Sequence, residues 1–304
     1  MTATLTVSLA GRDFLRISDL SPAEAETILD RAVELRAEPK QPLLAGATLG
    51  LYFSKHSTRT RVSFSAGMAQ LGGVAIPLAP EELQLSRGES LPDTARALSG
   101  YLDALAVRTH GHAELEAWAE WASIPVINAL TAEEHPCQAL ADALTMRDRL
   151  GSLDGARVAW VGDGSNVLVS LAALGTLLGY EVVAACPPGY EPKNEAASNT
   201  MSLAVVRDPR EAVEGADVVV TDTWISMGQE HERVQRLLDL EPYRVDRNLL
   251  AFAAAEAFVM HCLPAHPGEE ITAEVLYGDR SAIWDEAENR LHVQKALLVR
   301  LLRG

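Results

Sequence analysis

The sequence predicts an α/β protein of two domains, each a mainly parallel sheet flanked by helices. From Gly46 onward, short apolar runs rich in Val, Ile and Leu alternate with longer stretches of helical period, which is the pattern of βαβ units. The chain has 304 residues, and domains of roughly 150 residues would make two of them. A polar, glycine-containing break at 151–156 separates two such series of runs, and we expect the domain boundary there.

The first half opens with a helix and continues with four predicted strands. In the segment 21–38, Ser21 can cap the helix, Pro22 fits its first turn and Glu24 completes a capping box. The predicted strands are the runs 49–54, 73–78, 104–109 and 124–129, separated by helical stretches. A further helix over 138–150 leads into the break at 151–156.

The second half repeats the strand and helix alternation and ends in a helix. Its predicted strands are the runs 157–162, 181–186, 201–206, 216–222 and 257–264. Each run is nearly all apolar, as expected for strands that are covered on both faces. The last helix, over 288–302, could pack on either domain as far as its own residues indicate.

Composition excludes several classes of protein. Hydrophobic residues make up 48% and charged residues 22% of the chain, which is typical of a globular protein and not of a collagen-like or disordered one. The formal net charge of −16 repels phosphate backbones and anionic lipids, so we expect neither nucleic acid nor membrane as a partner. An anionic ligand therefore needs a local basic pocket.

Cysteine usage and the start of the chain indicate the compartment. The cysteines Cys137, Cys186 and Cys262 are too scattered for a disulfide framework or a paired metal-binding motif. The first twenty residues lack the continuous apolar segment of a secretion signal. We therefore expect a cytoplasmic protein.

Basic and polar side chains follow the predicted strands of the first half, where ligands of open parallel sheets bind. The segment 57–61, Ser-Thr-Arg-Thr-Arg, opens a helix, which Ser57 or Thr58 is expected to cap. The free backbone N–H groups that follow, together with Arg59, make an anion site of the kind that phosphates use. Arg108 ends a strand and can polarise a carbonyl oxygen or clamp a phosphate. His135 and Gln138 follow the next strand. The alternatives are a solvated helix start at Arg59 and a structural role for His135.

A different set of residues follows the strands of the second half. Gly162-Asp163-Gly164 invites a dinucleotide interpretation, but Val167 stands where the third glycine would be. Asn166 and Asp222 suit a zwitterionic ligand that carries a second amine. Three alternatives stay open for Cys262 from the sequence: a nucleophile, a metal ligand or a small buried hydrophobe.

Taken together, these segments resemble the aspartate/ornithine carbamoyltransferase family over nearly the whole chain. The family's carbamoyl phosphate signature matches 57–61, and its further contacts to that substrate match Gln84, Arg108 and 135–138. Its ornithine branch is matched more specifically by 222–228, Asp-Thr-Trp-Ile-Ser-Met-Gly, and by the segment His261-Cys262-Leu263-Pro264. Arg290 matches the arginine near the C-terminus of that branch.

The resemblance implies a division of labour between domains and a set of site residues. Residues 1–150 with the last helix, 288–304, would bind carbamoyl phosphate, and 151–287 would bind ornithine. The catalytic residues implied are Arg108, His135, Cys262 and Asp222. The implied carbamoyl phosphate contacts are Ser57, Thr58, Arg59, Thr60, Gln84, Arg108, His135, Pro136, Cys137, Gln138, Cys262, Leu263 and Arg290. The implied ornithine contacts are Asn166, Asp222, Ser226 and Met227.

The expected reaction is attack of the uncharged δ-amine of ornithine on the carbonyl carbon of carbamoyl phosphate, giving citrulline and phosphate. The resemblance further implies a role in arginine biosynthesis, no metal and no organic cofactor, and a homotrimer or a multiple of trimers in which Gln84 can act in a neighbouring subunit. Acetylornithine or putrescine as acceptor, a nicotinamide-dependent dehydrogenase and a phosphate sensor are the alternatives. Whether Cys262 or Asp222 receives the amine proton stays open.

Overall fold

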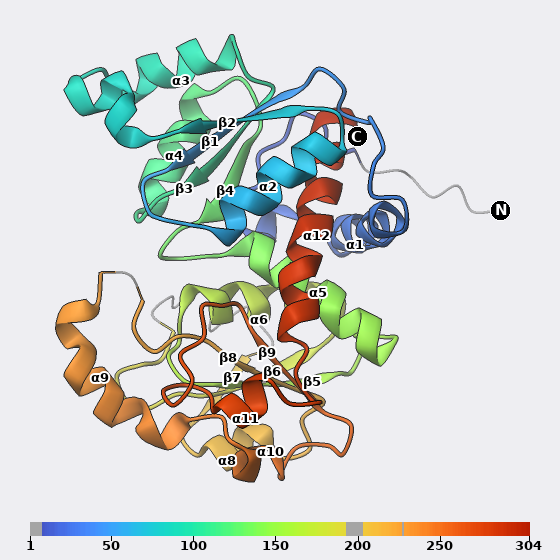
Figure 1. The fold of residues 1–304 in the computed structure, drawn as a ribbon, viewed down its shortest axis with the longest axis vertical. Helices are drawn as coiled ribbons and strands as arrows, with labels where there is room; N and C mark the ends of the chain where they lie inside the picture. Colours follow the sequence, from blue (N-terminus) through green and yellow to red (C-terminus); the bar gives the residue numbers. More distant parts are fainter. Residues whose placement is uncertain (1–7, 193–202, 227) are drawn as a thin grey trace. The chain divides into compact units, whose positions relative to one another are not determined.

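The computed structural model describes residues 8–192, 203–226 and 228–304. It contains two compact units, one made of the chain up to Leu140 together with Asn289–Gly304 and the other of Ala141–Glu288 (Figure 1). Each unit holds a parallel sheet flanked by helices. The predicted fold class is thus confirmed, including a C-terminal helix that returns to the first unit.

The first unit is built on a four-stranded parallel sheet with the strand order β2-β1-β3-β4. All four apolar runs predicted in the first half form its strands. These are β1 Thr48–Phe53, β2 Val74–Leu78, β3 Ala104–Arg108 and β4 Val126–Leu130. The central strand β3 is buried along its whole length, whereas the edge strand β2 is largely exposed.

Helices cover both faces of this sheet. They are α1 Pro22–Ala37, α2 Arg59–Gln70, α3 Leu91–Ser99, α4 His112–Trp121, the start of α5 Pro136–Leu150 and most of α12 Ile283–Arg303, with short 3-10 turns η1 Ile17–Asp19, η2 Pro80–Glu82 and η3 Gln84–Arg87. Trp118 of α4 and Ala95 of α3 share a core with Tyr52 and Val107 of the sheet. Figure 1 shows α2 and α12 on the opposite side.

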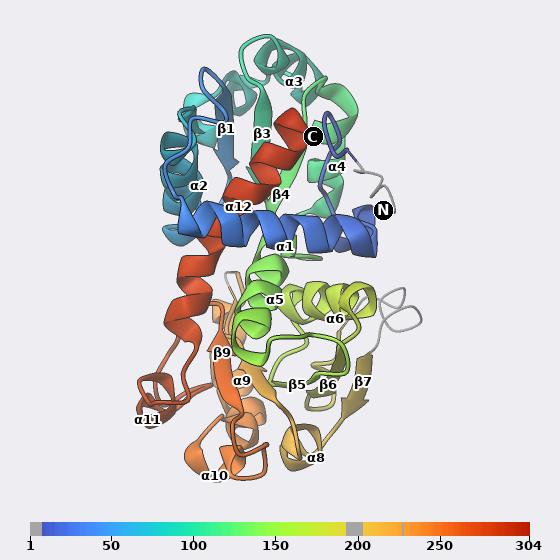
Figure 2. The same cartoon turned by 90° about the vertical axis from the view of Figure 1, so that its right-hand side faces the viewer.

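The start of α1 and its packing on α12 follow from particular side chains. The Ser21 hydroxyl accepts the Glu24 N–H at 3.3 Å, and the Glu24 carboxylate accepts the Ser21 N–H at 2.7 Å, so the predicted capping box is confirmed. Figure 2 shows α1 crossing α12. There the buried Lys295 ammonium donates to the Leu35 carbonyl at 2.9 Å, and burial lowers the pKa of Lys295.

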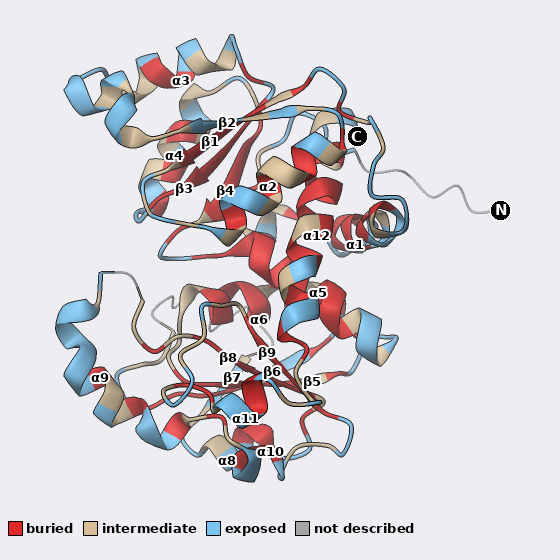
Figure 3. Cartoon of the chain, in the orientation of Figure 1, coloured by how far each residue is buried: buried red, intermediate tan, exposed pale blue. Residues whose placement is uncertain are grey.

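The second unit contains a five-stranded parallel sheet with the strand order β7-β6-β5-β8-β9. Its strands are β5 Arg157–Val161, β6 Glu181–Ala185, β7 Leu203–Val206, β8 Val218–Thr221 and β9 Phe258–His261. Its further helices are α6 Asn166–Leu178, α8 Pro209–Val213, α9 Arg233–Leu240, α10 Arg247–Leu250 and α11 Ala273–Leu276. Two 3-10 turns, η4 Glu230–Glu232 and η5 Glu241–Tyr243, flank α9. Side chains of α8, α10 and α11 pack on one face of the sheet, and Figure 3 shows that each of these short helices has both buried and exposed residues. The strands are largely buried on both faces as predicted, except β7 at one edge of the sheet, which leaves Val205 42% exposed.

Among the described residues, no helix has both the length and the apolar character required to cross a membrane.

Candidate active site

The carboxyl ends of the strands in the first unit are tied together by backbone hydrogen bonds. Ser54, after β1, donates both its N–H (2.9 Å) and its hydroxyl (3.2 Å) to the carbonyl oxygen of Arg108 at the end of β3. Thr109 donates to the Leu130 carbonyl at the end of β4 at 3.1 Å. Arg108, which is 8% exposed, is therefore held on a rigid segment between two neighbouring strands.

Three arginines and one histidine from distant parts of the sequence gather at this end of the first unit. His135 is fully buried, and burial together with the charges of Arg290, Arg108 and Arg59 holds its pKa well below the usual 6.5. The imidazole is therefore neutral at pH 7 and lies in a positive environment. Such a cluster suits an anionic ligand, because each guanidinium offers several fixed donors.

Thr60 joins this cluster through Arg290. A terminal nitrogen of the Arg290 guanidinium, on α12, donates to the Thr60 hydroxyl at 2.5 Å, and both side chains are buried. Thr58 occupies the N-cap position of α2, but its side chain accepts no capping hydrogen bond from the described residues. Of the two residues predicted to cap this helix, Ser57 or Thr58, the prediction is wrong for Thr58, and the positive end of α2 is suited to an anion.

The start of α5 holds His135 and Gln138 in place. The Gln138 N–H donates to the His135 carbonyl at 3.0 Å, and the Cys137 thiol donates to the Asn128 carbonyl of β4 at 3.5 Å. Pro136 begins the helix, where a proline loses no hydrogen bond. Burial raises the pKa of Cys137 to about 12, so this thiol is a structural contact and not a nucleophile.

Gln84 lies outside this cluster in the described contacts. It begins the exposed turn η3 between β2 and α3, and its backbone carbonyl accepts the Glu89 N–H at 3.1 Å. The predicted contact of Gln84 with carbamoyl phosphate stays a prediction.

In the second unit, the carboxylate of Asp222 joins the segments that follow three adjacent strands. Oδ1 accepts the Cys262 thiol after β9 at 3.0 Å and the Thr223 N–H at 2.7 Å. Oδ2 accepts the Ser165 hydroxyl after β5 at 3.3 Å. Since β5, β8 and β9 are neighbours in the sheet, their order brings these residues together. Burial, and then the Asp222 charge, raises the pKa of Cys262 well above its usual value.

The other predicted ornithine contacts lie on the same segments. Asn166 is the first residue of α6, which Ser165 caps through the Val167 N–H at 3.3 Å. Ser226 lies in the loop after β8, where its N–H donates to the Gln229 side chain at 3.0 Å. Met227 lies outside the described residues.

The glycines at 162–164 have a structural reason that does not involve a dinucleotide. Gly162 adopts a φ of 132°, which side chains rarely allow. A Cβ on Gly164 would come within 2.4 Å of the Pro192 nitrogen, and the Gly164 N–H donates to the Tyr190 carbonyl at 2.7 Å. Close approach of the backbone at 189–192 explains this glycine.

Arg236 is a residue of this site that the sequence argument missed. It is 6% exposed on α9, pairs with the Asp163 carboxylate and donates from Nε to the Trp224 carbonyl at 2.6 Å. It therefore connects the loop after β5 to the loop after β8. A sequence signal exists, because Arg236 shares the buried face of α9 with Leu240, four residues later.

Two groups of described residues bring possible metal ligands within 4.8 Å of one another, Asp222 with His261 and Cys262, and His266 with Glu269 and Glu270. Both nitrogens of His261 are engaged, by the Leu263 N–H and by Glu270. Glu269 forms an ion pair with Arg233. A metal ion at either group would therefore have to compete with these internal contacts of His261 and Glu269.

Two family models match the chain and together cover most of it. Residues 12–148 match the aspartate/ornithine carbamoyltransferase, carbamoyl-P binding domain, and residues 154–301 match the Asp/Orn binding domain of the same family. Among curated proteins, the ornithine carbamoyltransferase of Methanoculleus marisnigri is 50% identical over 96% of this chain and 97% of its own length. That of Carboxydothermus hydrogenoformans is also 50% identical, over 98% and 100%.

Solved structures give the same similarity in three dimensions. Ornithine carbamoyltransferase from Pyrococcus furiosus superimposes with a TM-score of 0.95 at 46% identity, covering 98% of this chain and 99% of that one. The enzyme from Thermus thermophilus gives a TM-score of 0.90 at 40% identity, covering 96% and 99%.

Proposed function

This chain belongs to the aspartate/ornithine carbamoyltransferase family, and we propose that its first unit binds carbamoyl phosphate and its second unit binds ornithine. The chain transfers the carbamoyl group of carbamoyl phosphate to the δ-amine of L-ornithine, giving L-citrulline and phosphate. The observation that carries the assignment of residues is the gathering of Arg59, Arg108 and Arg290 around a neutral His135. It provides the local basic site that a doubly charged anion needs in a chain of net charge −16.

In the first unit, the phosphate and the carbonyl oxygen of the substrate need different partners. We assign the phosphate to Ser57, Thr58, Arg59 and Thr60 at the start of α2, with Arg290 completing the group. The carbonyl oxygen gains negative charge as the amine attacks, and Thr60, Arg108 and His135 are its proposed donors. A well-placed donor of this kind contributes about 3 to 4 kcal/mol to transition-state stabilisation.

The nitrogen of the carbamoyl group requires acceptors and close packing. Gln138 and the backbone of Cys262 and Leu263 are its proposed contacts, while Pro136 and Cys137 shape the start of α5. Gln138 is fully buried, so its amide is confined to one geometry, which favours catalysis by positioning.

The attacking amine must lose a proton before it can react. An alkyl amine has a pKa near 10.4, so less than about 1 in 1,000 molecules is nucleophilic at pH 7 without assistance. The raised pKa of Cys262 keeps its sulfur protonated, and a protonated thiol cannot accept another proton. We therefore assign to Asp222 the task of orienting or accepting this proton, and to Cys262 that of holding the Asp222 carboxylate.

The α-amino acid end of ornithine is assigned to Asn166, Ser226 and Met227. Support comes from Asn166, at the N-terminal end of α6, where the helix favours a carboxylate. It also comes from the contact of Ser165 with Asp222, which joins the two substrate-binding segments.

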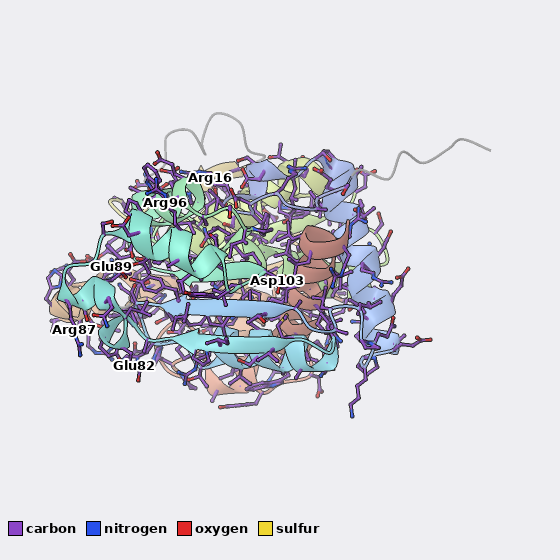
Figure 4. The ribbon with its side chains drawn as sticks, turned by 90° about the horizontal axis from the view of Figure 1, so that it is seen from above. Arg16, Glu82, Arg87, Glu89, Arg96 and Asp103 are labelled. Atoms are coloured by element: carbon purple, nitrogen blue, oxygen red, sulfur yellow. The ribbon has the colours of Figure 1, made fainter. Side chains whose placement is uncertain are left out.

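We further propose a homotrimer or a multiple of trimers. The edge strand β2 and the neighbouring α2 expose large apolar side chains, with Val62 57%, Val74 58% and Ile76 41% exposed, and such a patch is typical of a protein interface. The loop with Gln84 lies next to it in the sequence, and Figure 4 shows Glu82, Arg87 and Glu89 of this loop at the outer margin of the first unit. Gln84 is proposed to act in a neighbouring subunit.

Location and metabolic role are proposals as well. The described chain holds three free cysteines, which supports a reducing compartment such as the cytoplasm. A role in arginine biosynthesis is proposed from the identity of the product, citrulline.

The test is a citrulline assay with carbamoyl phosphate and ornithine, run beside acetylornithine and putrescine as acceptors. We expect ornithine to be preferred by a large factor in kcat/KM, and Arg59→Ala and Arg108→Ala to lose at least a hundredfold. Arg247→Ala is the matched control, because Arg247 is 82% exposed in the second unit. Absence of citrulline, or preference for another amine, would refute the assignment.

A further inference from the structure

His261, at the end of β9, is a buried titratable group to which the proposed mechanism gives no role. Its side chain is 0% exposed. Nδ1 accepts the Leu263 N–H at 2.9 Å, and Nε2 lies 3.1 Å from Oε1 of Glu270. Because a backbone N–H can only donate, Nδ1 carries the lone pair and Nε2 carries the proton that Glu270 accepts. The two contacts therefore fix one tautomer and one orientation of the ring.

Two buried carboxylates contact His261, one at its ring and one at its backbone N–H. Glu270 is fully buried, and its Oε1 also accepts the His266 N–H. Glu286 is 1% exposed, and its Oε2 accepts the His261 N–H at 2.8 Å. Burying a carboxylate is costly unless it is hydrogen-bonded, so both carboxylates are stabilised by their hydrogen bonds at the end of β9.

The segment that His261 holds contains the thiol that contacts Asp222. Leu263 adopts a φ of 59°, a left-handed conformation that leucine rarely takes without support from its surroundings. The His261 ring accepts a hydrogen bond from the Leu263 N–H. Cys262, between the two, places its sulfur 3.0 Å from Asp222. A change at Leu263 would therefore turn Cys262 away from that carboxylate.

We propose that His261 is a positioning residue for the ornithine site, and that Glu270 acts through it. The imidazole holds the turn at Leu263, and the turn directs the Cys262 thiol toward Asp222. This inference rests on the proposed assignment of Asp222 to the amine of ornithine. It adds a chain of contacts from Glu270 to His261, then to Leu263 and Cys262, that the motif itself does not reveal.

The test uses two substitutions, each of which preserves one of the two hydrogen-bonding positions of the imidazole. His261→Asn places an amide oxygen near the position of Nδ1 and keeps an acceptor for Leu263. His261→Gln places its amide near Nε2, so it can still reach Glu270 but leaves the Leu263 N–H without its acceptor. We expect His261→Gln to raise the KM for ornithine at least tenfold and to speed alkylation of Cys262 by iodoacetamide. We expect His261→Asn, which keeps an acceptor for Leu263 but loses the contact with Glu270, to show a clearly smaller effect than His261→Gln in both measurements.

Matched controls separate positioning from general damage. His231→Gln changes an exposed imidazole of the same unit and should change neither measurement, and thermal unfolding of every variant reports its stability. Equal effects of His261→Gln and His261→Asn on the KM, or an unchanged alkylation rate in His261→Gln, would overturn the proposal. The alkylation rate requires no turnover, so it tests the positioning even if the wild-type chain makes no citrulline.

Discussion

The Cys262 thiol donates a hydrogen bond to the Asp222 carboxylate over 3.0 Å and so connects the residue after β9 with the residue after β8. The contact raises the pKa of the thiol further, beyond the larger effect of burial. A neutral thiol that donates to a carboxylate is a hydrogen-bond donor and not a nucleophile. We therefore propose unequal roles for the two residues, with the carboxylate nearer the chemistry.

Cys262→Ser is expected to lose far less activity than Arg108→Ala. Serine keeps a donor for Asp222, so the loss in kcat should stay within about tenfold. Removing Arg108 takes away a proposed donor to the developing oxyanion, and such a loss costs about 10² to 10³ in kcat. Steady-state citrulline kinetics measure both, and a carbamoyl adduct trapped on Cys262 would contradict the donor role.

Native cysteines are expected to resist alkylation. Burial raises the pKa of Cys137 and of Cys186 to about 12, so at pH 8 only about one thiol in 10,000 is a thiolate. Mass spectrometry after iodoacetamide should show slow labelling of the folded protein and rapid labelling in denaturant. Fast native labelling of Cys137 would mean that the start of α5 opens readily.

His135 is expected to make stability depend on pH. Its pKa is near 6.5 in the unfolded chain and well below that in the folded one. Below pH 6.5 the unfolded state therefore binds more protons, so the free energy of unfolding should decrease, by at most about 1.4 kcal/mol per pH unit. Above pH 6.5, His135 is neutral in both states, so the folded protein keeps the stability that it loses on acidification.

The comparison that isolates this effect is His135→Gln, whose side chain does not titrate. The difference in unfolding free energy between wild type and variant should change between pH 7 and pH 5, with the wild type losing more. Denaturant unfolding at several pH values measures it. Parallel pH curves for the two proteins would show that His135 titrates normally.

Exposed apolar residues on the edge strand lead to a prediction about assembly. Ile76→Lys and Val74→Lys place charges on a patch that we propose is covered by another copy, and each should shift the trimer toward smaller species. Light scattering after size exclusion gives the mass. Val234→Lys, at a position that is 76% exposed on α9, is the control. A wild-type protein that is monomeric at micromolar concentration would refute the trimer.

The strands could be predicted from the sequence because βαβ units bury continuous apolar runs, and each predicted run forms a strand. The sequence also predicts that Arg59, Arg108 and His135 lie at the same end of the sheet, because parallel strands place their carboxyl ends together. The partners of these residues could not be predicted. Arg290 reaches Thr60 across 230 positions, and Glu270 binds His261 only because of the fold of the intervening loop.

The cap at Thr58 shows the limit of local rules. A threonine before a helix usually caps it, yet here the side chain makes no such bond to the described residues. A site that binds an anion at a helix start needs those N–H groups available, so the local rule fails where we propose that the substrate binds.

Arg236→Met is expected to impair the ornithine site while leaving the carbamoyl phosphate site largely intact. Arg236 connects the Asp163 carboxylate to the Trp224 carbonyl, and both belong to segments that carry proposed ornithine contacts. Its loss removes the arginine partner of the partly buried Asp163 carboxylate, at a cost of up to about 3 to 5 kcal/mol in stability. It also frees the loop after β8, so the KM for ornithine should rise at least tenfold and that for carbamoyl phosphate by less than threefold.

Two further variants separate the loop effect from the loss of stability. Arg236→Met with Asp163→Asn removes both charges, so much of the stability should return while the KM for ornithine stays high, because the Trp224 carbonyl still lacks its donor. Arg247→Met changes an exposed arginine of the same unit and should behave as the wild type. Recovery of both stability and KM in the double variant would mean that only the ion pair matters, and that the bond to Trp224 does not position the loop.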